Sequence, residues 1–239
     1  LDGLAANVQV QSLGKESGAK KWQQFRTSQK IFKTLVKQVD GVFVHQIPLY
    51  TLLVGRWASK YRKKLVMWYA HGMVDTKLRL ASLYVNEFVT SSRLGLRLKT
   101  KTPITIVGQG INLERFKLKT LAERQHPTFN IISVGRISPV KRNDLLINSL
   151  GSMIHADPNI KYNITVSFFG TPALKEQEEY ARELQTMARE FHVGKILNFY
   201  GGVPNREIPQ KLYDADLFVN LSQTGSLDKA VLELSLIHI

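Results

Sequence analysis

The 239-residue chain is 44% hydrophobic and 22% charged, a composition typical of a folded globular protein rather than a disordered one. It has no cysteine, which excludes a disulfide framework, a zinc–thiolate site and a cysteine nucleophile, and which fits a reducing cytoplasm. The longest apolar run, near residues 47–55, is far shorter than the roughly 20 residues of a membrane-spanning helix, so we expect no such helix.

The formal charge of +14 is distributed unevenly along the chain. Residues 1–125 contain 22 Lys+Arg against 7 Asp+Glu, whereas residues 126–239 contain 11 against 12. Together with the polar stretch 117–127, this asymmetry predicts two domains, residues 1–125 and 126–239. The basic first half is either solvated surface, a surface that attracts an anionic membrane, or a nucleic-acid surface. Its KYRKK run (60–64) leads into an apolar segment without interleaved exposed aromatic residues, so we expect no nucleic-acid partner.

In the first half, apolar segments alternate with helical patterns. A helix is expected over residues 22–39. The expected strands are VQVQSL (8–13), GVFVH (41–45), KLVMWY (64–69), EFVT (87–90) and ITIV (104–107).

The second half repeats this alternation more regularly. Ser138 is expected to cap a helix with Pro139 at its first position, a second helix is expected to start at Thr171-Pro172, and Asn205 is expected to cap a third. Regular alternation of strand and helix predicts a parallel sheet with ligands at the carboxyl ends of its strands. We therefore predict an α/β protein with two Rossmann-like domains in series. The expected strands of this half are FNIISV (129–134), ITVSFF (164–169), ILNFY (196–200) and LFVNL (217–221), each followed by a small residue.

Gly135, Arg136 and Lys141 lie between an expected strand and an expected helix. A helix starting near Pro139 would point its free backbone N–H groups and its positive dipole end at this position. Arginine offers a planar fork for phosphate oxygens, and lysine offers a mobile point charge. The arrangement predicts a site for a phosphate or diphosphate, and two solvated cations are the alternative.

These residues also carry a resemblance. The order Gly135-Arg136, four residues, then Lys141, followed by FYGGVPNREIPQKLYDADLFVNLS (199–222) and TGSLDKAVLE (224–233), resembles the donor domain of glycosyltransferase family 4, retaining transferases of the GT-B fold. Upstream, VTSSRLGLRLKTKTPITIVGQGINLERF (89–116) resembles the end of that family's first domain. The similarity runs in matching order over roughly residues 40–234. It implies a GT-B fold and a nucleotide-sugar donor.

The resemblance implies roles for single residues. Arg136 and Lys141 match the pair that holds the donor diphosphate, and Glu233 matches the second glutamate of an E-x7-E motif, which accepts hydrogen bonds from the ribose. Gly225 stands where the first glutamate of that motif would be, so the expected contact with the sugar departs from the family pattern. The donor-binding residues expected on these grounds are Gly135, Arg136, Lys141, Gly202, Val203, Gly225, Ser226, Leu227, Asp228, Lys229 and Glu233.

His71 follows the expected strand KLVMWY and occupies a place where the family often has a histidine near the donor sugar. A histidine there can donate a hydrogen bond or move a proton, and a capping role is the alternative. His71, Arg136 and Lys141 are our candidate catalytic residues.

The resemblance also bears on the ends of the chain. The family's glycine-rich amino-terminal loop would precede Leu1, and both domains are expected to be incomplete. Residues 234–239 read LSLIHI instead of the small residues and glycine expected after Glu233, so we expect them to be foreign sequence.

The expected function is transfer of a sugar from a nucleotide-diphosphate sugar, with retention of configuration, to a lipid-linked or cell-envelope glycan. Departure of the nucleoside diphosphate develops negative charge that Arg136 and Lys141 would stabilise. No cofactor and no metal are expected, because Asp214 and Asp216 have no further ligand at useful spacing. We expect a cytoplasmic protein that docks peripherally on the anionic inner face of the membrane.

Two alternatives remain open. One is a phosphorylase-like or other nucleotide-binding enzyme of the same fold. The other is a non-catalytic basic module that binds polyanions.

Overall fold

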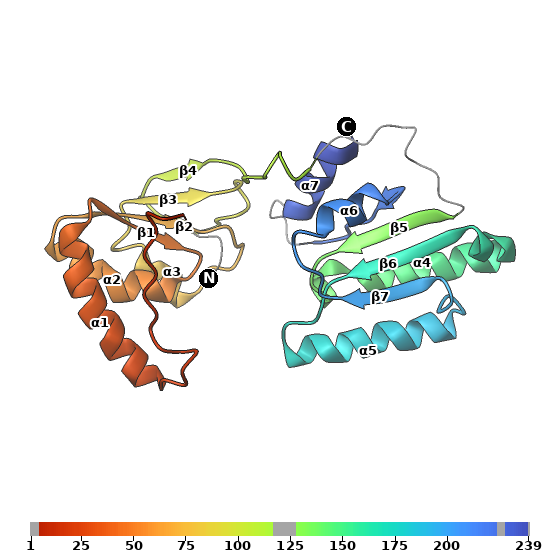
Figure 1. Ribbon diagram of the computed structural model, residues 1–239, viewed down its shortest axis with the longest axis horizontal. Coiled ribbons are helices and arrows are strands. Elements are labelled where there is room, and N and C mark those ends of the chain that lie inside the picture. The colour runs from red at the N-terminus through yellow and green to blue at the C-terminus, as the bar shows by residue number, and fades with distance from the viewer. Residues whose placement is uncertain (1–4, 117–127, 224–227, 239) are drawn as a thin grey trace. The chain divides into compact units, whose positions relative to one another are not determined.

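The computed structural model describes residues 5–116, 128–223 and 228–238, and Figure 1 shows its helices and strands. The chain divides into two compact units, residues 1–108 (unit 1) and 109–239 (unit 2). This division lies earlier than the predicted one after residue 125, because Ile111 and Phe116 pack with the core of unit 2. Unit 1 contains 18 Lys+Arg against 5 Asp+Glu, and unit 2 contains 15 against 14.

Unit 1 is built on a parallel sheet with the strand order β1-β2-β3-β4. The buried side chains of its helices and first three strands, among them Val36, Leu65, Met67, Leu78 and Phe88, form one core. The predicted helix and four of the five predicted strands are confirmed. Its elements are α1 (Lys21–Gln38), β1 (Gly41–His45), α2 (Pro48–Lys60), β2 (Lys64–Trp68), α3 (Thr76–Ala81), β3 (Glu87–Thr90) and β4 (Ile104–Ile106).

The fifth prediction for unit 1, a strand over residues 8–13, is wrong. Val8 and Val10 are 47% and 52% exposed, and within the described residues β1 pairs only with β2. Alternation of apolar and polar residues gives a segment a face to bury, but a strand also needs a neighbour for its backbone groups.

Unit 2 is also built on a parallel sheet, with the order β7-β6-β5-β8. The four predicted strands are confirmed, although β8 is much shorter than predicted. The elements are β5 (Phe129–Val134), the 3₁₀ turn η2 (Pro139–Lys141), α4 (Asn143–Ala156), the 3₁₀ turn η3 (Pro158–Tyr162), β6 (Ile164–Phe169), α5 (Lys175–Glu190), β7 (Leu197–Gly201), α6 (Ile208–Tyr213), β8 (Leu217–Phe218) and α7 (Lys229–His238).

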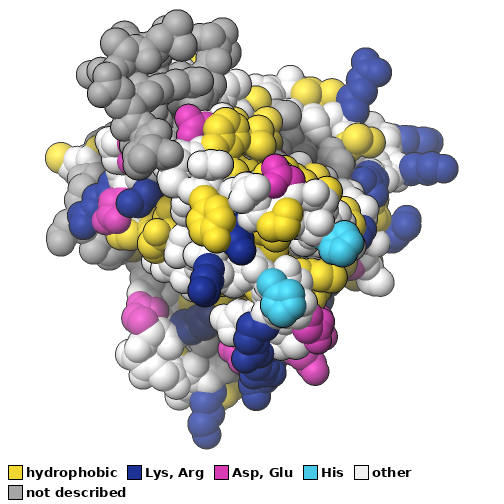
Figure 2. All heavy atoms as spheres, turned by 90° about the vertical axis from the view of Figure 1, so that its right-hand side faces the viewer, with side chains coloured by type: hydrophobic (Ala, Val, Ile, Leu, Met, Phe, Trp, Pro, Cys, Tyr) yellow, Lys and Arg dark blue, Asp and Glu magenta, His cyan; other side chains and the backbone are white. Residues whose placement is uncertain are grey.

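Side chains from the two faces of the central strands pack into two different hydrophobic cores. Ile131 and Val166 pack with α4 and α5, whereas Ile132 and Phe169 pack with Leu212 of α6 and its neighbours. Helices therefore cover both faces of this sheet (Figure 1), which explains why its strands read as continuous apolar runs. Leu234 and Leu236 of α7 pack against the second of these cores. Residues 234–238 thus continue a helix that belongs to unit 2. Figure 2, which shows the face on the right-hand side of Figure 1, has both positive and negative side chains on it.

The three helix starts predicted for unit 2 all lie too early. Helix α4 begins at Asn143, after a 3₁₀ turn that starts at Pro139. The side chain of Ser138 makes no capping hydrogen bond. Helix α5 begins at Lys175 and α6 at Ile208. A proline fixes its own φ but does not commit the residues after it to an α-helix.

The backbones of Gly135 and Gly170 approach each other closely where β5 and β6 end. The N–H of Gly135 donates to the carbonyl of Phe169 (2.9 Å), and that of Gly170 donates to the carbonyl of Gly201 (2.7 Å). Gly135 and Gly170 have φ values of +142° and +152°. A Cβ added to Gly170 would lie 1.9 Å from the carbonyl oxygen of Gly135, so only glycine fits there.

We predict that Gly170→Ala lowers the free energy of unfolding of unit 2 by at least about 2 kcal/mol, because the new methyl group meets backbone and the φ value is unfavourable. Urea unfolding followed by circular dichroism measures this change. Gly194→Ala is the matched control, because its Cβ would make only an ordinary contact, 3.8 Å from the Ala188 carbonyl oxygen. Equal stability of the two variants would contradict the assigned close approach.

Candidate functional site

The strand order of unit 2 places a topological switch point between β5 and β8. The chain proceeds from β5 to β6 and β7 on one side and then returns to the other side of β5 with β8. In open parallel sheets, ligands bind at the carboxyl ends of the strands beside such a switch point. The residues that leave β5 and β8 here are Gly135-Arg136 and Val219-Asn220.

Lys141 reaches this strand end from the 3₁₀ turn η2. A Cβ added to Gly135 would lie 3.1 Å from Cε and 3.4 Å from Nζ of Lys141, so the lysine side chain passes directly over the glycine. Its Nζ forms an ion pair with the carboxylate of Asp228, and the two side chains are 23% and 20% exposed. The structure therefore brings together Gly135, Lys141 and Asp228, three of the residues predicted from the sequence.

Asp228 is the centre of this cluster. Its Oδ2 accepts hydrogen bonds from Lys141 and from Nδ2 of Asn220 (2.8 Å), and its Oδ1 accepts from the backbone N–H of Ala230 (3.2 Å). Burial acts to raise the pKa of Asp228, but the hydrogen bonds from Lys141 and Asn220 and the charge of Lys141 outweigh it and lower that pKa. The carboxylate is therefore ionised at neutral pH.

Asn220 was not predicted as a site residue. It lies two residues after the end of β8, and polar side chains at the strand ends of a parallel sheet face the ligand edge, but the sequence predicted a strand that ran on to residue 221. The same side chain shapes the loop that follows, since its Oδ1 accepts from the N–H of Ser222 (3.0 Å).

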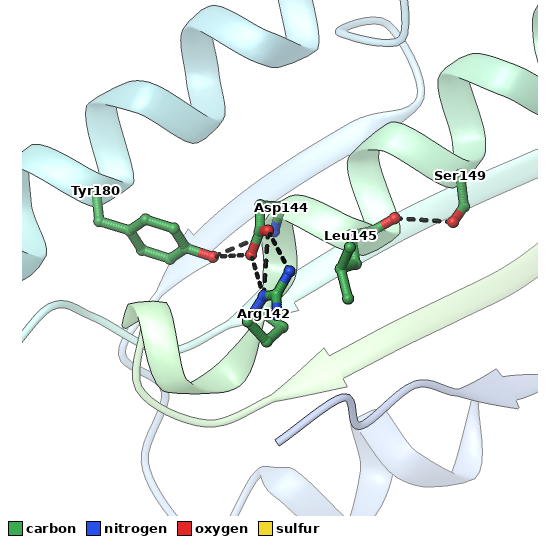
Figure 3. Close-up of polar contacts among 5 residues, drawn as sticks. All are labelled: Arg142, Asp144, Leu145, Ser149 and Tyr180. Carbon is green, nitrogen blue, oxygen red and sulfur yellow. Dashed lines mark hydrogen bonds and ion pairs between the residues drawn. The ribbon is translucent and has the colours of Figure 1, made fainter. Parts of the chain in front are cut away.

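A second polar cluster holds the start of α4, immediately after Lys141 (Figure 3). Arg142 adopts the left-handed conformation (φ 51°, ψ 41°), and its guanidinium contacts the carboxylate of Asp144 at 3.2–3.3 Å. The hydroxyl of Tyr180, from α5, donates to Asp144 (2.7 Å) and accepts from the backbone N–H of Asp144 (3.2 Å). These contacts fix the residue that follows Lys141 and so help to direct that lysine.

The pKa values of this second cluster follow from its contacts. Burial, with the hydrogen bond to Asp144 and the charge of Asp144, raises the pKa of Tyr180 to about 12. Burial of Asp144 acts to raise its pKa, but the hydrogen bonds from Tyr180 and Arg142 and the charge of Arg142 lower it. The cluster thus holds one negative and one positive charge and a neutral phenol at neutral pH.

Glu233 lies on α7 and is 5% exposed. Its carboxylate forms an ion pair with Lys229, one turn earlier on the same helix, at 3.2 Å. Lys229 is itself half exposed, with a side-chain exposure of 49%. In the structure, therefore, two of the predicted donor-binding residues partner each other.

Arg136 and the end of β7 complete the described part of the site in unit 2. The Arg136 side chain is exposed, and among the described residues it forms no ion pair. Gly202 is exposed and follows Gly201, whose φ is +73°, while Val203 packs against the core shared with α6. The cationic charge of Arg136 is thus free to meet a ligand at the end of β5.

His71 belongs to unit 1, in the loop after β2. Its side chain is exposed, its Nδ1 accepts a hydrogen bond from the N–H of Met73 (3.1 Å), and its ring lies edge-on to Tyr69. The hydrogen bond from Met73 belongs to a local turn and uses Nδ1, so Nε2 is the ring nitrogen that could meet a ligand. The predicted site residues Gly225, Ser226 and Leu227 lie outside the described residues.

In the described ranges, no group of three or more histidine, aspartate or glutamate side chains is arranged to hold a metal ion. Among the same residues, no helix has the length and apolar character that crossing a membrane requires.

Residues 122–233, which include the cluster around Asp228, match the family model described as "Glycosyl transferases group 1". A curated relative, D-inositol 3-phosphate glycosyltransferase of Geodermatophilus obscurus, is 28% identical over 134 residues, which cover 54% of this chain and 30% of the relative.

Solved structures resemble a larger part of the chain. Anabaena Alr3699/HepE in complex with UDP has a TM-score of 0.72 at 16% identity and covers 88% of this chain and 61% of its own. A UDP-forming trehalose-phosphate synthase from Burkholderia xenovorans has a TM-score of 0.65 at 10% identity and covers 92% of this chain and 63% of its own. These likenesses confirm the predicted α/β fold of the GT-B type. The chain spans about three fifths of these structures and under a third of the curated relative.

We predict that Asp228→Asn lowers the free energy of unfolding of unit 2 by about 1–2 kcal/mol at neutral pH, because Lys141 loses its charged partner. Since the pKa of Asp228 is lower in the folded protein, its contribution is fully present above the pKa of the unfolded chain and is lost as the pH falls through the folded pKa. The difference from the unmodified protein should therefore shrink in acid.

Urea unfolding at several pH values measures this difference. Glu190→Gln, which removes an exposed carboxylate from the end of α5, is the matched control and should show little difference at any pH. If the free energies of unfolding of Asp228→Asn and the unmodified protein differ by the same amount at acidic and neutral pH, the Asp228 carboxylate is not the stabilising group.

Proposed function

We propose that this protein is a glycosyltransferase that moves a sugar from a nucleotide-diphosphate sugar to an acceptor. The observation that carries the proposal is the convergence of Lys141, Asp228 and Asn220 beside Gly135, at the switch point of a sheet within the segment that matches the group 1 glycosyl transferases. The UDP bound to a structure of the same fold supports a nucleotide donor.

The chemistry of the site suits a diphosphate leaving group. Glycine at the end of β5 allows backbone to approach the ligand closely, and Arg136 offers an exposed guanidinium beside it. Lys141 is already directed over Gly135, where it would meet phosphate oxygens. As the sugar–phosphate bond breaks, negative charge grows on the departing diphosphate, and these two cations stabilise it.

In this proposal Lys141 exchanges partners when the donor binds. Without a ligand its charge is balanced by Asp228, so the site is not left as an isolated, partly buried cation. A diphosphate carries more negative charge than one carboxylate and competes for the lysine. Asp228 is then available to accept a hydrogen bond from a sugar hydroxyl. The resemblance assigns contact with the sugar to the first glutamate of the E-x7-E motif, and this chain has Gly225 at that position.

The finer assignments rest on the resemblance to glycosyltransferase family 4. We propose retention of the anomeric configuration, with His71 as a group near the donor sugar and Glu233 as the ribose-binding carboxylate. The charge of unit 1 supports a lipid-linked or cell-envelope glycan as acceptor and a cytoplasmic protein that docks on the inner face of the membrane. No metal is needed for the charge stabilisation that this mechanism assigns to Arg136 and Lys141.

The test is calorimetric titration of the protein with UDP, GDP and ADP, repeated with Arg136→Ala and Lys141→Ala. We expect one nucleotide to bind, each variant to weaken that binding at least about tenfold, and Arg136→Ala to reduce turnover by about 10²-fold or more. Lys195→Ala is the matched control, since it removes an exposed cation that precedes β7, away from the carboxyl ends of the strands.

Each outcome decides between the alternatives. Binding that is lost only in the Arg136 and Lys141 variants supports the phosphate site and names the base of the donor. Turnover with inorganic phosphate as acceptor would instead indicate a phosphorylase-like enzyme. If no nucleotide binds, or if Arg136→Ala turns over normally, the proposal is wrong.

A further inference from the structure

Helix α1 carries an unbroken stripe of cations. Arg26, Lys30, Lys33 and Lys37 follow one another at spacings of four, three and four residues, which puts them on one face of an α-helix. All four side chains are exposed, whereas Ser28, on the opposite side of the helix, is buried, and Val36 packs into the core of unit 1. The stripe runs along most of the length of α1.

Within the described residues, no carboxylate forms an ion pair with a cation of this stripe. From Lys21 to Lys64 the sequence contains ten Lys+Arg and one acidic residue, Asp40. In the part of unit 1 that the structure describes, none of these ten cations forms an ion pair with a carboxylate, whereas Lys141, Arg142 and Lys229 of unit 2 all do. Cations kept apart from carboxylates in this way produce a strong positive potential over one surface.

Aromatic rings extend the stripe from α1 to the end of α2. The ammonium group of Lys37 lies 5.4 Å from the ring centre of Tyr61, and that of Lys60 lies 6.0 Å from the same ring. Arg56 lies 4.5 Å from the ring centre of Trp57. Gln29 of α1 holds the two helices together, because its Oε1 accepts from the indole N–H of Trp57 (2.9 Å). The cations of both helices thus belong to one surface, built on α1 packed against α2 (Figure 1).

The first turns of α1 add exposed aromatic side chains to this surface. Trp22 and Phe25 are 58% and 51% exposed, and Arg26 lies 4.8 Å from the ring centre of Trp22. Exposed aromatic rings beside lysine and arginine are the composition of helices that lie in the interface of a bilayer, where the rings enter the headgroup region and the cations meet anionic lipids.

We propose that this surface docks unit 1 on an anionic lipid bilayer, with α1 lying lengthwise in the interface. The surface, which we call the α1–α2 cationic surface, consists of Trp22, Phe25, Arg26, Lys30, Lys33, Lys37, Arg56 and Lys60. It deepens the proposed function by naming the part of the chain that would bring the enzyme to a lipid-linked acceptor. Each lysine or arginine near such a membrane contributes to attraction, and the attraction is screened by salt.

Single-stranded nucleic acid fits this surface less well than a bilayer. Binding of single strands depends on free ring faces for the bases to stack on. The rings of Trp57 and Tyr61 are only partly exposed, and cations of the protein itself lie over them. Of the aromatic side chains on the surface, Trp22 and Phe25 are the exposed ones, and they stand together at one end.

The test is co-sedimentation of the protein with phosphatidylcholine vesicles, with and without phosphatidylglycerol, at low and high salt. We expect binding only to the vesicles with phosphatidylglycerol, and Lys30→Gln/Lys33→Gln to weaken it at least about tenfold. The control, Lys77→Gln/Arg79→Gln, removes the same charge from exposed positions of α3 in the same unit and should bind almost as the unmodified protein does. Trp22→Phe should lose most of the blue shift in tryptophan fluorescence that accompanies vesicle binding.

Three results would overturn this proposal: no vesicle binding at low salt, equal losses in the two double variants, or tighter binding to single-stranded oligonucleotide than to the vesicles. Titration with nucleotides in the absence of lipid reports separately on the donor site. If the protein does not bind vesicles, the proposed transferase activity is therefore unaffected. If no nucleotide binds, the proposed membrane surface is likewise unaffected.

Discussion

The close approach of two backbones, at Gly135 and Gly170, is the constraint on which the candidate site depends. A side chain at Gly170 would collide with the carbonyl of Gly135, and a side chain at Gly135 would fill the space that Lys141 crosses. With both positions reduced to backbone, the ends of β5 and β6 stay joined and the lysine can reach the edge of the sheet. The position of Asp228 follows, because it partners that lysine.

The two units treat charge in opposite ways. In unit 2, Lys141, Arg142 and Lys229 are each paired with a carboxylate, so these charges are held in place and released only to a ligand that competes for them, and Arg136 is the exposed exception at the site. In unit 1, Arg26, Lys37, Arg56 and Lys60 lie over aromatic rings, and the cations of α1 stay exposed. Paired charges provide a positioned site for a small anion, and unpaired charges provide attraction to an extended anionic surface. The nearly neutral unit and the strongly basic one thus suit different partners.

Much of the fold could be predicted because it depends on local patterns. Apolar runs followed by a small residue identified the strands of unit 2, and their regular alternation with helices gave the parallel sheet. The strand predicted over residues 8–13 failed because pairing depends on a neighbour that the segment's own pattern does not contain. The helix starts failed for a related reason, since Pro139 is compatible with both a 3₁₀ turn and an α-helix.

Gly135, Lys141 and Asp228 were predicted as site residues from the sequence, but the contacts between them were not. Gly135 and Lys141 are six residues apart, so strand-to-turn geometry relates them. Their partners are distant in sequence: Asp228 lies 87 residues from Lys141, and Tyr180 lies 36 residues from Asp144. Contacts over such separations depend on the order of strands in the sheet, and that order could not be predicted from this sequence alone. The role of Asn220 could be recognised only once β8 was known to lie beside β5.

The left-handed conformation of Arg142 limits the order in which this chain can change. A residue with a side chain is disfavoured there, and the contact of its guanidinium with Asp144 offsets part of that cost. If Asp144 is replaced first, the unfavourable backbone remains while its compensation is gone. If Arg142 first becomes glycine, the backbone cost disappears and Asp144 is needed only by Tyr180. Of the two routes by which a sequence could leave this arrangement, only the second avoids a markedly less stable intermediate.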